Sequence, residues 1–464
     1  MTFVRRMAEF TSHASYADLS EAARQQLRIR VLDALGCALG AVGAETVRRV
    51  RDAATEGGTS GSSTLIGGGH AAPDRAALVN GAYVRYLDFN DSYLAPNETC
   101  HPSDNLGATL AAAEAANADG RTLLTALGVA YQVQCRLGDA APVRDHGFDH
   151  VTHLAYSAAA GASRALGLDV ERTSNAIAIA GTALNALRVT RTGVLSNWKG
   201  LAAPFGAANA VEATLLARHG ITGPPEVFEG NKGFMQAIAG QFSIDWEHED
   251  LERVTHTILK KFNAEIHSQS ALQALLDLKA REGFTARDVD HVSVEIFGVA
   301  HRIIGGGEEG DKRSVLTKED ADHSLPYMLA VALLDGNVLP AQYAPERIRR
   351  ADVQGLLRRI TIRPNDEFSR RFPGEMVVHV AVRVADGRLL EVERTDYPGF
   401  ITRPMDWDSA LTKFRMLGEP HVDPTLLTEI SGAVQALDHL QVAELTRLLA
   451  RAGVPGAHAS REAA

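Results

Sequence analysis

The segment LSEAARQQLRIRVLDALGCALGAV, residues 19–42, decides the fold class, because its apolar residues recur with a helical period. A spacing of four places them on one face of an α-helix; they are Leu27, Val31, Leu35 and Leu39. The alanine and glycine residues between them are small, so neighbouring helix axes can approach closely. We therefore expect a densely packed helical domain around this segment.

The segments that follow repeat this composition as far as about residue 260. Gly, Pro and Asp residues separate them, as expected at helix ends. No internal repeat of 30 to 50 residues is evident, which argues against an array of repeated units. Examples are RTLLTALGVAYQVQCRL (121–137), LAYSAAAGASRAL (154–166) and LAAPFGAANAVEATLLARHG (201–220).

The pattern changes after about residue 265, where segments with strand-like alternation appear at 291–300, 358–366, 376–384 and 388–397. Ala385-Asp386-Gly387 joins the last two and predicts a hairpin. A helical pattern occurs at 323–336 and returns after 405. We therefore predict a mainly α protein with an inserted α+β domain: residues 1–265 and 405–464 form the all-helical domain, and residues 266–404 form the α+β domain.

Composition excludes several classes of function. The 464 residues carry a formal net charge of -10 and no long basic run, which argues against nucleic-acid binding and a polybasic membrane patch. The three cysteines, Cys37, Cys100 and Cys135, are too widely spaced for a disulfide framework or a zinc ribbon. The N-terminus lacks the apolar region of a signal peptide, and the apolar stretch 31–44 is too short to span a bilayer. We expect a soluble cytoplasmic protein.

A polar group surrounds the start of the alanine-rich segment 106–116. YLDFND (86–91) and HPSDN (101–105) bring Asp88, Asp91, His101, Ser103 and Asp104 within 17 residues. A carboxylate beside an imidazole suits general acid–base catalysis. Capping of the following helix is the alternative for Ser103 and Asp104. It does not explain why Asp88 and His101 occur together.

The segment HGFDHVTH places His146, His150 and His153 four and three residues apart. On a helix this spacing would suit a metal ion. Gly147 weakens the helix, however, and no carboxylate stands at ligand spacing. We therefore favour a substrate-contacting His150, or a hydrogen-bonded structural histidine, and predict no metal.

Lysines in apolar surroundings are further candidates, because a buried ammonium is costly unless it is paired. Lys199 begins an alanine-rich helix in SNWKGLAAPFG, and Lys260 and Lys261 precede His267 in ILKKFNAEIHSQSA. The lysine pair could instead be a surface doublet. In ADHSLPYMLAVALLDG, Asp322 could cap a helix, and Tyr327 could be a buried tyrosine with a satisfied hydroxyl.

The motifs of nucleotide-binding proteins and the nucleophile elbow of hydrolases are absent from the sequence. No GxGxxG follows a strand, and neither GxxxxGKS nor GxSxG occurs. The glycine triplets at 67–69 and 305–307 are not followed by a nucleotide-loop pattern. We therefore expect no phosphate loop and no dinucleotide cofactor.

Taken in order, the motifs resemble those of the MmgE/PrpD family over about residues 5 to 450. They are YLDFNDSY…HPSDN, NWKGLAAPFGAANA, KKFNAEIHSQ, ADHSLPYMLAVALLDG and DYPGFITRPMDW. The family includes 2-methylcitrate dehydratase and cis-aconitate decarboxylase. The resemblance implies a large all-helical domain, an α+β lid, a homodimer, and catalysis on a small tricarboxylate without metal, iron–sulfur cluster or other cofactor.

The resemblance also implies which residues form the site. Asp88 and His101 match the active-site loop, and Ser92 stands where the decarboxylases carry threonine. His150 stands near a family histidine, with His153 competing for that place. His267 follows a dehydratase-like EIHSQ pattern. The remaining family positions are matched by Lys199, Lys261 and Tyr327.

The chemistry that fits these residues is the dehydration of 2-methylcitrate, or of citrate. Lys199 and Lys261 would stabilise charge that develops on a carboxylate. His101 would be the acid–base group, with Asp88 as its orienting residue or counterpart, and Tyr327 would hold a carboxylate or donate a proton. The same residues could serve a cis-aconitate decarboxylase or another polycarboxylate lyase. A catalytically inactive binding or assembly protein is the alternative from another class.

Overall fold

The computed structural model describes residues 1–96, 98–307 and 310–453. By internal contacts, these residues divide into two compact units. The first, called here the helical unit, comprises residues 1–190, 200–257 and the chain from 406 onward. The second, called the sheet unit, comprises Arg191–Lys199 and Ile258–Met405. The sequence led us to expect residues 191–199 and 258–265 in the all-helical domain, whereas by contacts they belong to the sheet unit.

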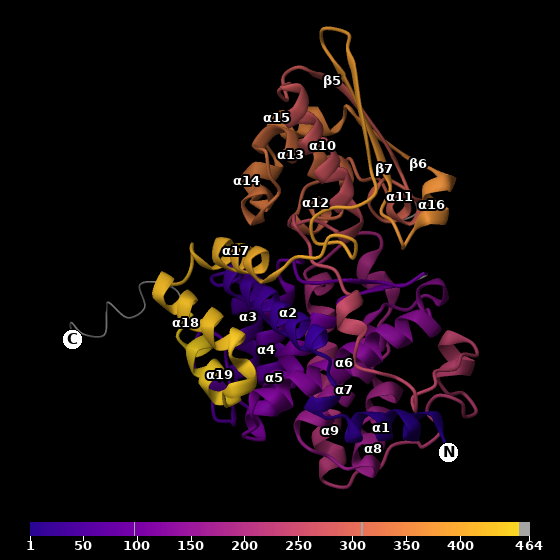
Figure 1. Cartoon of the computed structure of the whole chain (residues 1–464), viewed down its shortest axis with the longest axis vertical. Helices are drawn as coiled ribbons and strands as arrows, with labels where there is room; N and C mark the ends of the chain where they lie inside the picture. The colour runs from indigo at the N-terminus through magenta and orange to yellow at the C-terminus, as the bar shows by residue number, and fades with distance from the viewer. Residues whose placement is uncertain (97, 308–309, 454–464) are drawn as a thin grey trace, which may run out of the picture. The chain divides into compact units, whose positions relative to one another are not determined.

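The helical unit is built mainly from helices (Figure 1). The residues of its central helices, such as α5 and α7, are mostly buried. Helix α6 packs along α7, α4 along α5, and α1 along α8. Its helices are α1 (Phe3–His13), α2 (Glu21–Gly40), α3 (Glu45–Thr55), α4 (Pro73–Arg85), α5 (Leu106–Ala115), α6 (Gly120–Ala140), α7 (Val151–Ala165), α8 (Val170–Ala183), α9 (Trp198–Arg218, from Gly200), α17 (Trp407–Gly418), α18 (Pro424–Gln435) and α19 (Val442–Ala450).

The helical unit is not entirely helical, in contrast to the prediction. It contains two antiparallel ribbons, β1 (Ser63–Thr64) with β2 (His70–Ala71), and β3 (Tyr93–Leu94) with β4 (Thr99–Cys100). Two paired residues per strand are too few to produce a readable alternation of polar and apolar residues. The second ribbon shapes the loop that precedes His101.

The chain returns to the helical unit through α17, which packs against α2 although the two helices are far apart in the sequence (Figure 1). Gly36 of α2 permits this approach, since a Cβ added there would lie 3.0 Å from the Cα of Phe414. Lys413 of α17 is buried; its Nζ lies 2.7 Å from Asp33 Oδ1 and donates to the carbonyl of Phe89 at 2.7 Å. A glycine on α2 and a buried ion pair therefore join α2, near the start of the chain, to α17, more than 350 residues later.

The sheet unit contains a four-stranded sheet in the order β6-β5-β7-β8. Strand β5 (Val289–Ile296) pairs in parallel with β6 (Ile360–Pro364) and antiparallel with β7 (Val378–Val384). Strand β8 (Leu389–Arg394) pairs antiparallel with β7, which confirms the predicted hairpin. Apolar residues alternate along β5 and β7 because one face of the sheet is covered, in part by α10 (Gln269–Glu282).

The remaining helices of the sheet unit are mostly short. The exception is α13 (Leu325–Asp335), which packs on α10 and carries Tyr327. Ser324, not Asp322, caps α13, because its side chain accepts a hydrogen bond from the Tyr327 amide. The others are α11 (Gly298–Ile304), α12 (Lys318–Ala321), α14 (Pro345–Ile348), α15 (Ala351–Leu357) and α16 (Asp366–Arg371).

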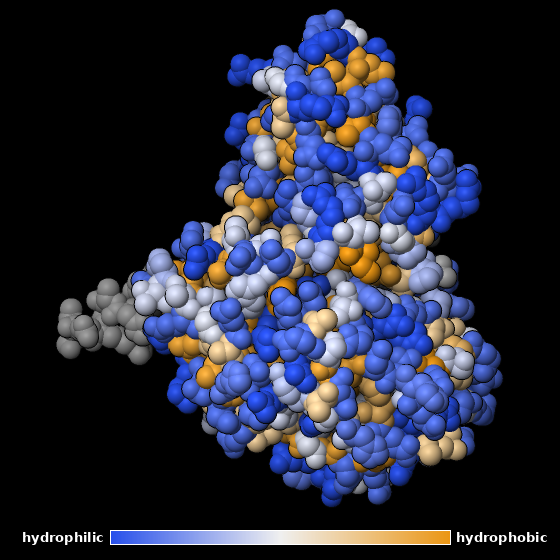
Figure 2. Space-filling model, viewed as in Figure 1, coloured by the Kyte–Doolittle hydropathy of each residue, from blue (hydrophilic) through white to orange (hydrophobic). Residues whose placement is uncertain are grey.

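Hydrophilic side chains cover most of the molecular face shown in Figure 2, and apolar side chains are scattered among them. In the described part of the chain, no helix combines the length and the apolar character needed to cross a lipid bilayer. The apolar residues of the long helices instead lie inside the helical unit.

The close approach of α17 to α2 predicts that Gly36→Ala lowers the free energy of unfolding by roughly 1–3 kcal/mol, because the added methyl group overpacks the contact with Phe414. Gly432→Ala in α18 is the matched control, since a Cβ there meets nothing within 4 Å and alanine favours the helix by up to about 1 kcal/mol. Urea unfolding of both variants provides the measurement. Equal stability of the two variants would contradict the proposed constraint.

Candidate active site

Asp88 lies in the buried loop after α4 and has an unusual backbone. Its φ of 52° is in the left-handed region, which is uncommon for residues other than glycine. Arg85, in the last turn of α4, donates from Nη1 to Asp88 Oδ1 at 2.5 Å, and its Nε lies 3.6 Å from Asp104 Oδ2. All three side chains are buried, so the guanidinium compensates two carboxylates that would otherwise be costly to bury.

Asp91 is the centre of a second set of contacts in the same loop. One carboxylate oxygen accepts from the Ser103 amide at 3.0 Å, and the other accepts from the Tyr131 hydroxyl at 2.7 Å. Burial and the Asp91 charge raise the pKa of Tyr131. Asn90 donates to Ser103 Oγ at 2.9 Å and to Asp104 Oδ1 at 3.0 Å. The alternative that Ser103 and Asp104 are helix caps is therefore wrong, because their side chains hold this loop together.

His101 follows β4 and is buried, and its Nδ1 lies 2.8 Å from the main-chain carbonyl of Asp91. A carbonyl can only accept a hydrogen bond, so Nδ1 carries the proton. In the neutral ring, the lone pair is then on Nε2. Ser92 Oγ lies 3.1 Å from the same Nδ1. The structure thus brings Ser92 and His101 together, as expected for members of one site.

His150 lies at the N-terminus of α7, next to His101. The two rings are 5.4 Å apart between centroids at an interplanar angle of 73°. Asp149 Oδ1 lies 3.2 Å from His150 Nδ1, and Asp149 Oδ2 lies 3.8 Å from Arg188. The structure therefore brings together His101, His150 and Ser92, which we call the histidine cluster.

His153, which competed with His150 for a place in the site, is a structural residue. Its Nε2 donates to the carbonyl of Ala141 at 2.8 Å, and the ring is fully buried. Burial lowers the pKa of His153 to about 4, so the ring is neutral near pH 7. His146 is exposed in a short turn before α7. The three histidines of HGFDHVTH therefore do not share one helix face.

Lys199 belongs to a second buried group, which lies within the sheet unit. Its Nζ donates to Asp322 and lies 2.7 Å from His323 Nδ1. Asp322 also accepts from Lys318 at 3.0 Å and lies 2.8 Å from His323 Nδ1. Burial alone would raise the pKa of Asp322, but Lys199, Lys318 and His323 outweigh burial and hold it well below its usual range. Asp322 is therefore ionised and favours the charged form of Lys199.

Glu265 continues this group from the segment before α10. Its carboxylate lies 2.7 Å from His267 Nδ1 and accepts from the His267 amide at 2.8 Å. Burial alone would raise its pKa, but the contact with His267 and the charges of His323 and Lys260 outweigh burial and lower it to about 2. We call Lys199, Lys260, Glu265, His267, Asp322 and His323 the lysine–carboxylate cluster.

Two predicted site residues have contacts outside this cluster. Lys261 is exposed; its Nζ donates to Gln273 Oε1 at 2.7 Å. Tyr327 is buried, and its hydroxyl donates to the carbonyl of Gln342, which matches the alternative of a satisfied core tyrosine. Lys260, the neighbour of Lys261, is fully buried and acts electrostatically on Glu265. By burial and charge, Lys260 is the stronger candidate of the pair.

The sequence analysis did not single out Arg85 and Glu265 as candidate site residues. Arg85 stands in ALVNGAYVRYL, a helix that is otherwise almost entirely apolar, and a charge in such a segment is the signal that indicated Lys199. Glu265 stands two residues before His267, which could have indicated an ion pair. Asp322 and His323 were considered only as residues near a helix start.

Both clusters can perform defined chemistry. The histidine cluster offers an imidazole whose Nδ1 is held by a main-chain carbonyl, which suits proton transfer. The lysine–carboxylate cluster offers buried ammonium groups, which suit binding of a carboxylate or stabilisation of its developing charge. Buried ionisable groups with perturbed pKa values are typical of enzyme active sites. Each of the two units therefore carries one buried group of ionisable residues that suits proton transfer or charge stabilisation.

The chain belongs to the MmgE/PrpD family. The MmgE/PrpD N-terminal domain matches residues 5–247, and the MmgE/PrpD C-terminal domain matches residues 262–439. The family assigned from motifs is thus confirmed over most of the chain.

Curated relatives are similar along most of their length. The chain is 28% identical to 2-methylcitrate dehydratase of Escherichia coli K12, with 85% of this chain and 86% of that protein covered. It is 29% identical to 2-methylcitrate dehydratase of Cupriavidus necator, with 79% and 80% covered. It is 27% identical to alkylcitrate dehydratase phiI of a fungal species, with 93% and 90% covered.

The pKa of Glu265 predicts an acid-sensitive contribution to stability. A folded-state pKa of about 2 lies below the usual value of about 4.5, so the ionised carboxylate stabilises the fold above pH 4.5. This contribution, about 3 kcal/mol at most, is lost as the pH falls from 4.5 toward 2. Glu265→Gln should therefore be less stable than wild type at pH 6, and the difference should shrink at lower pH.

Denaturant unfolding at a series of pH values provides the measurement. Glu247→Gln, at an exposed position, is the control and should follow the wild-type curve within about 0.5 kcal/mol. A stability difference for Glu265→Gln that stays constant between pH 6 and pH 3 would refute the ionised, paired state of Glu265.

Proposed function

We propose that this protein is a hydro-lyase that dehydrates 2-methylcitrate to 2-methyl-cis-aconitate. The observation that carries this proposal is the similarity to 2-methylcitrate dehydratases along more than four fifths of both chains. The buried histidine cluster supports it, because removing a carbon-bound proton requires a placed base. The lysine–carboxylate cluster supports it, because the substrate carries three carboxylates.

In this proposal, His101 is the base. Nδ1 is committed to the carbonyl of Asp91, so Nε2 accepts the proton from the carbon next to a carboxylate. The electron pair of that carbon–hydrogen bond forms the new double bond. The carbon–oxygen bond of the β-hydroxyl breaks, and the oxygen leaves as water with the proton that His101, as the acid–base group, passes on to it. His150 packs against the His101 ring. Asp88, on the same loop, is proposed as the orienting residue or counterpart of His101.

Lys199 is proposed to stabilise the negative charge that develops on a substrate carboxylate when the proton is removed. Such a preplaced charge typically contributes a few kcal/mol in a dry site. Asp322 acts as a positioning residue, because it is held by Lys199 and Lys318 and maintains the charge of Lys199. Lys260 takes the role that the sequence assigned to Lys261, since Lys260 is the buried member of the pair.

We also propose that the protein acts as a homodimer in the cytoplasm, in the methylcitrate route of propionate breakdown. The support is the family resemblance, together with dehydratase relatives from several bacteria. For this chain we propose that no metal or organic cofactor is needed.

The substrate assignment predicts that EDTA-treated protein converts 2-methylcitrate to 2-methyl-cis-aconitate without releasing CO₂. Purified protein would be incubated with 2-methylcitrate, citrate and cis-aconitate, and products and CO₂ would be quantified. Itaconate and CO₂ from cis-aconitate would replace the dehydratase proposal with a decarboxylase. Loss of activity on EDTA treatment, restored by a divalent metal, would refute the metal-independent reaction.

The role of His101 predicts that His101→Ala lowers kcat by about 10²–10⁴-fold, the usual contribution of a general acid–base group. Circular dichroism and thermal unfolding should show that the variant folds. His146→Ala removes an exposed histidine from the same unit and should retain wild-type kcat. Unchanged turnover in folded His101→Ala would remove His101 from the mechanism.

A further inference from the structure

Exposed apolar side chains are concentrated in one stretch of the chain. Of the eleven large apolar residues that are exposed in the described part of the chain, seven lie between residues 187 and 221. Two of these seven, Val194 and Trp198, belong to the sheet unit. The other five belong to the helical unit; they are Leu187, Val189, Phe205, Leu216 and Ile221. Apolar side chains that gather on a surface in this way mark sites of protein association.

Helix α9 carries the centre of this surface. From Gly200 onward, a row of exposed and half-buried residues recurs along it at intervals of three or four: Leu201, Phe205, Asn209, Glu212 and Leu216. That spacing keeps the row on one face of the helix. The opposite face packs closely on the helical unit, since a Cβ added at Gly206 would lie 3.0 Å from the Val151 side chain of α7. One face of α9 therefore anchors the helix, and the other presents apolar residues to the outside.

The row is symmetric about its midpoint, which lies between Ala208 and Asn209. Leu201 and Leu216 stand at equal distances on either side of this point, and the small side chain of Ala208 at the centre lets a second helix approach closely. Two copies of α9 packed antiparallel about a two-fold axis at this point would place Leu201 against Leu216 of the partner subunit. A two-fold axis makes one surface patch its own partner. The row is therefore complementary to itself.

Glu212 is the one charged residue of the row. In the antiparallel arrangement it would lie about one helical turn from Asn209 of the partner subunit, whose side-chain amide can donate to the carboxylate. The same arrangement would set Phe205 over the methylene groups of Glu212 of the partner subunit. The charge is thus compatible with contact between two copies.

Leu187 and Val189 extend the apolar surface beyond α9. Leu187 pairs with Phe148 just before α7, and Val151 in the first turn of α7 is the residue on which Gly206 of α9 packs. Both segments therefore lie at the start of α7. This extension matters because a stable interface takes about 20–30 residues a side, more than the face of one helix provides.

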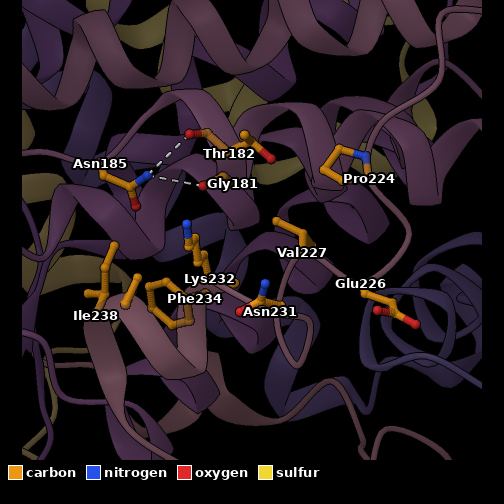
Figure 3. A pocket seen from close by; sticks show the side chains of 12 residues that line it. Gly181, Thr182, Asn185, Pro224, Glu226, Val227, Asn231, Lys232, Phe234 and Ile238 are labelled. Carbon is orange, nitrogen blue, oxygen red and sulfur yellow. Dashed lines mark hydrogen bonds between the residues drawn. The ribbon is translucent and has the colours of Figure 1, made fainter.

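The apolar surface ends beyond Ile221. There the segment 224–238 lines a cavity, and Figure 3 shows Glu226, Asn231 and Lys232 among the side chains around it. These three residues are polar and exposed. Contacts between proteins have an apolar centre and a polar rim, so this segment suits the rim of an interface centred on α9.

We propose that this face of α9 is the contact between two copies of the chain, with the two α9 helices antiparallel across the two-fold axis. The inference rests on the homodimer proposed above and adds the place where its subunits meet. The occupant is a second copy rather than an unrelated protein, because the row repeats itself under a two-fold rotation.

Sedimentation velocity of the full chain tests the surface. We expect the wild type to sediment as a dimer at about 10 μM, where an interface of standard size is formed. Leu216→Arg should raise the dimer dissociation constant at least about 100-fold, because the charge enters the apolar contact twice. Leu389→Arg on β8 is the matched control and should stay dimeric, since Leu389 is 51% exposed and Leu216 is 43% exposed. Circular dichroism should show that both variants fold.

Cross-linking of introduced cysteines tests the antiparallel geometry. In Asn209→Cys the two introduced thiols lie next to the axis, so a short bismaleimide should join the two subunits. In Arg218→Cys the two thiols are separated by about 28 Å along the helices, at a rise of about 1.5 Å per residue, and should not be joined. The native cysteines are buried and do not compete; they are Cys37, Cys100 and Cys135.

The two experiments separate this surface from the proposals on which it rests. A monomeric wild type would overturn the surface together with the homodimer. A dimer that persists in folded Leu216→Arg, or that is not joined in Asn209→Cys, would overturn the surface and leave the homodimer in place. If Leu216→Arg does not fold, the cysteine variants decide alone. Turnover of 2-methylcitrate is measured separately, so none of these results is confused with failure of the dehydratase proposal.

Discussion

The ammonium of Lys413 is the contact on which the helical unit depends. It is buried between Asp33 of α2 and the carbonyl of Phe89, and it lies 3.8 Å from the centre of the Phe89 ring. A buried charge is tolerated only when its partners are in place. The helix that closes the unit therefore also fixes the backbone next to Asp88. Asp33, Phe89 and Lys413 must therefore come together before the loop that carries Asp88 has its final form.

Much of the fold could be predicted from the sequence, because buried helices and half-buried strands leave periodic patterns. The spacing in residues 19–42 predicted α2, and the alternation in 376–397 predicted the β7–β8 hairpin. The ribbon of β3 and β4 was missed because two residues per strand show no period. The place of Arg191–Lys199 in the sheet unit was missed because it depends on the contact of Lys199 with Asp322, which no local pattern encodes.

The burial of Lys199 was predictable, because a charge stands there in an apolar segment. His101 was singled out because carboxylates stand near it in the sequence, and it is buried as well. The choice between Lys260 and Lys261 was not predictable, because the chain there is irregular and the direction of each side chain follows from tertiary packing. Tyr327 shows the same limit: helix periodicity places it inside, but only the structure shows that its hydroxyl is used by the Gln342 carbonyl.

The contact between His101 and the carbonyl of Asp91 has an evolutionary consequence. The group that decides which ring nitrogen holds the proton belongs to the main chain, and a main-chain carbonyl is present whatever side chain stands at that position. Point substitutions around the ring can change its charge environment and the shape of its surroundings while the basic nitrogen stays the same. With His101 as the proposed base, substitutions on this loop can change the contacts to the substrate and leave the proton acceptor in place.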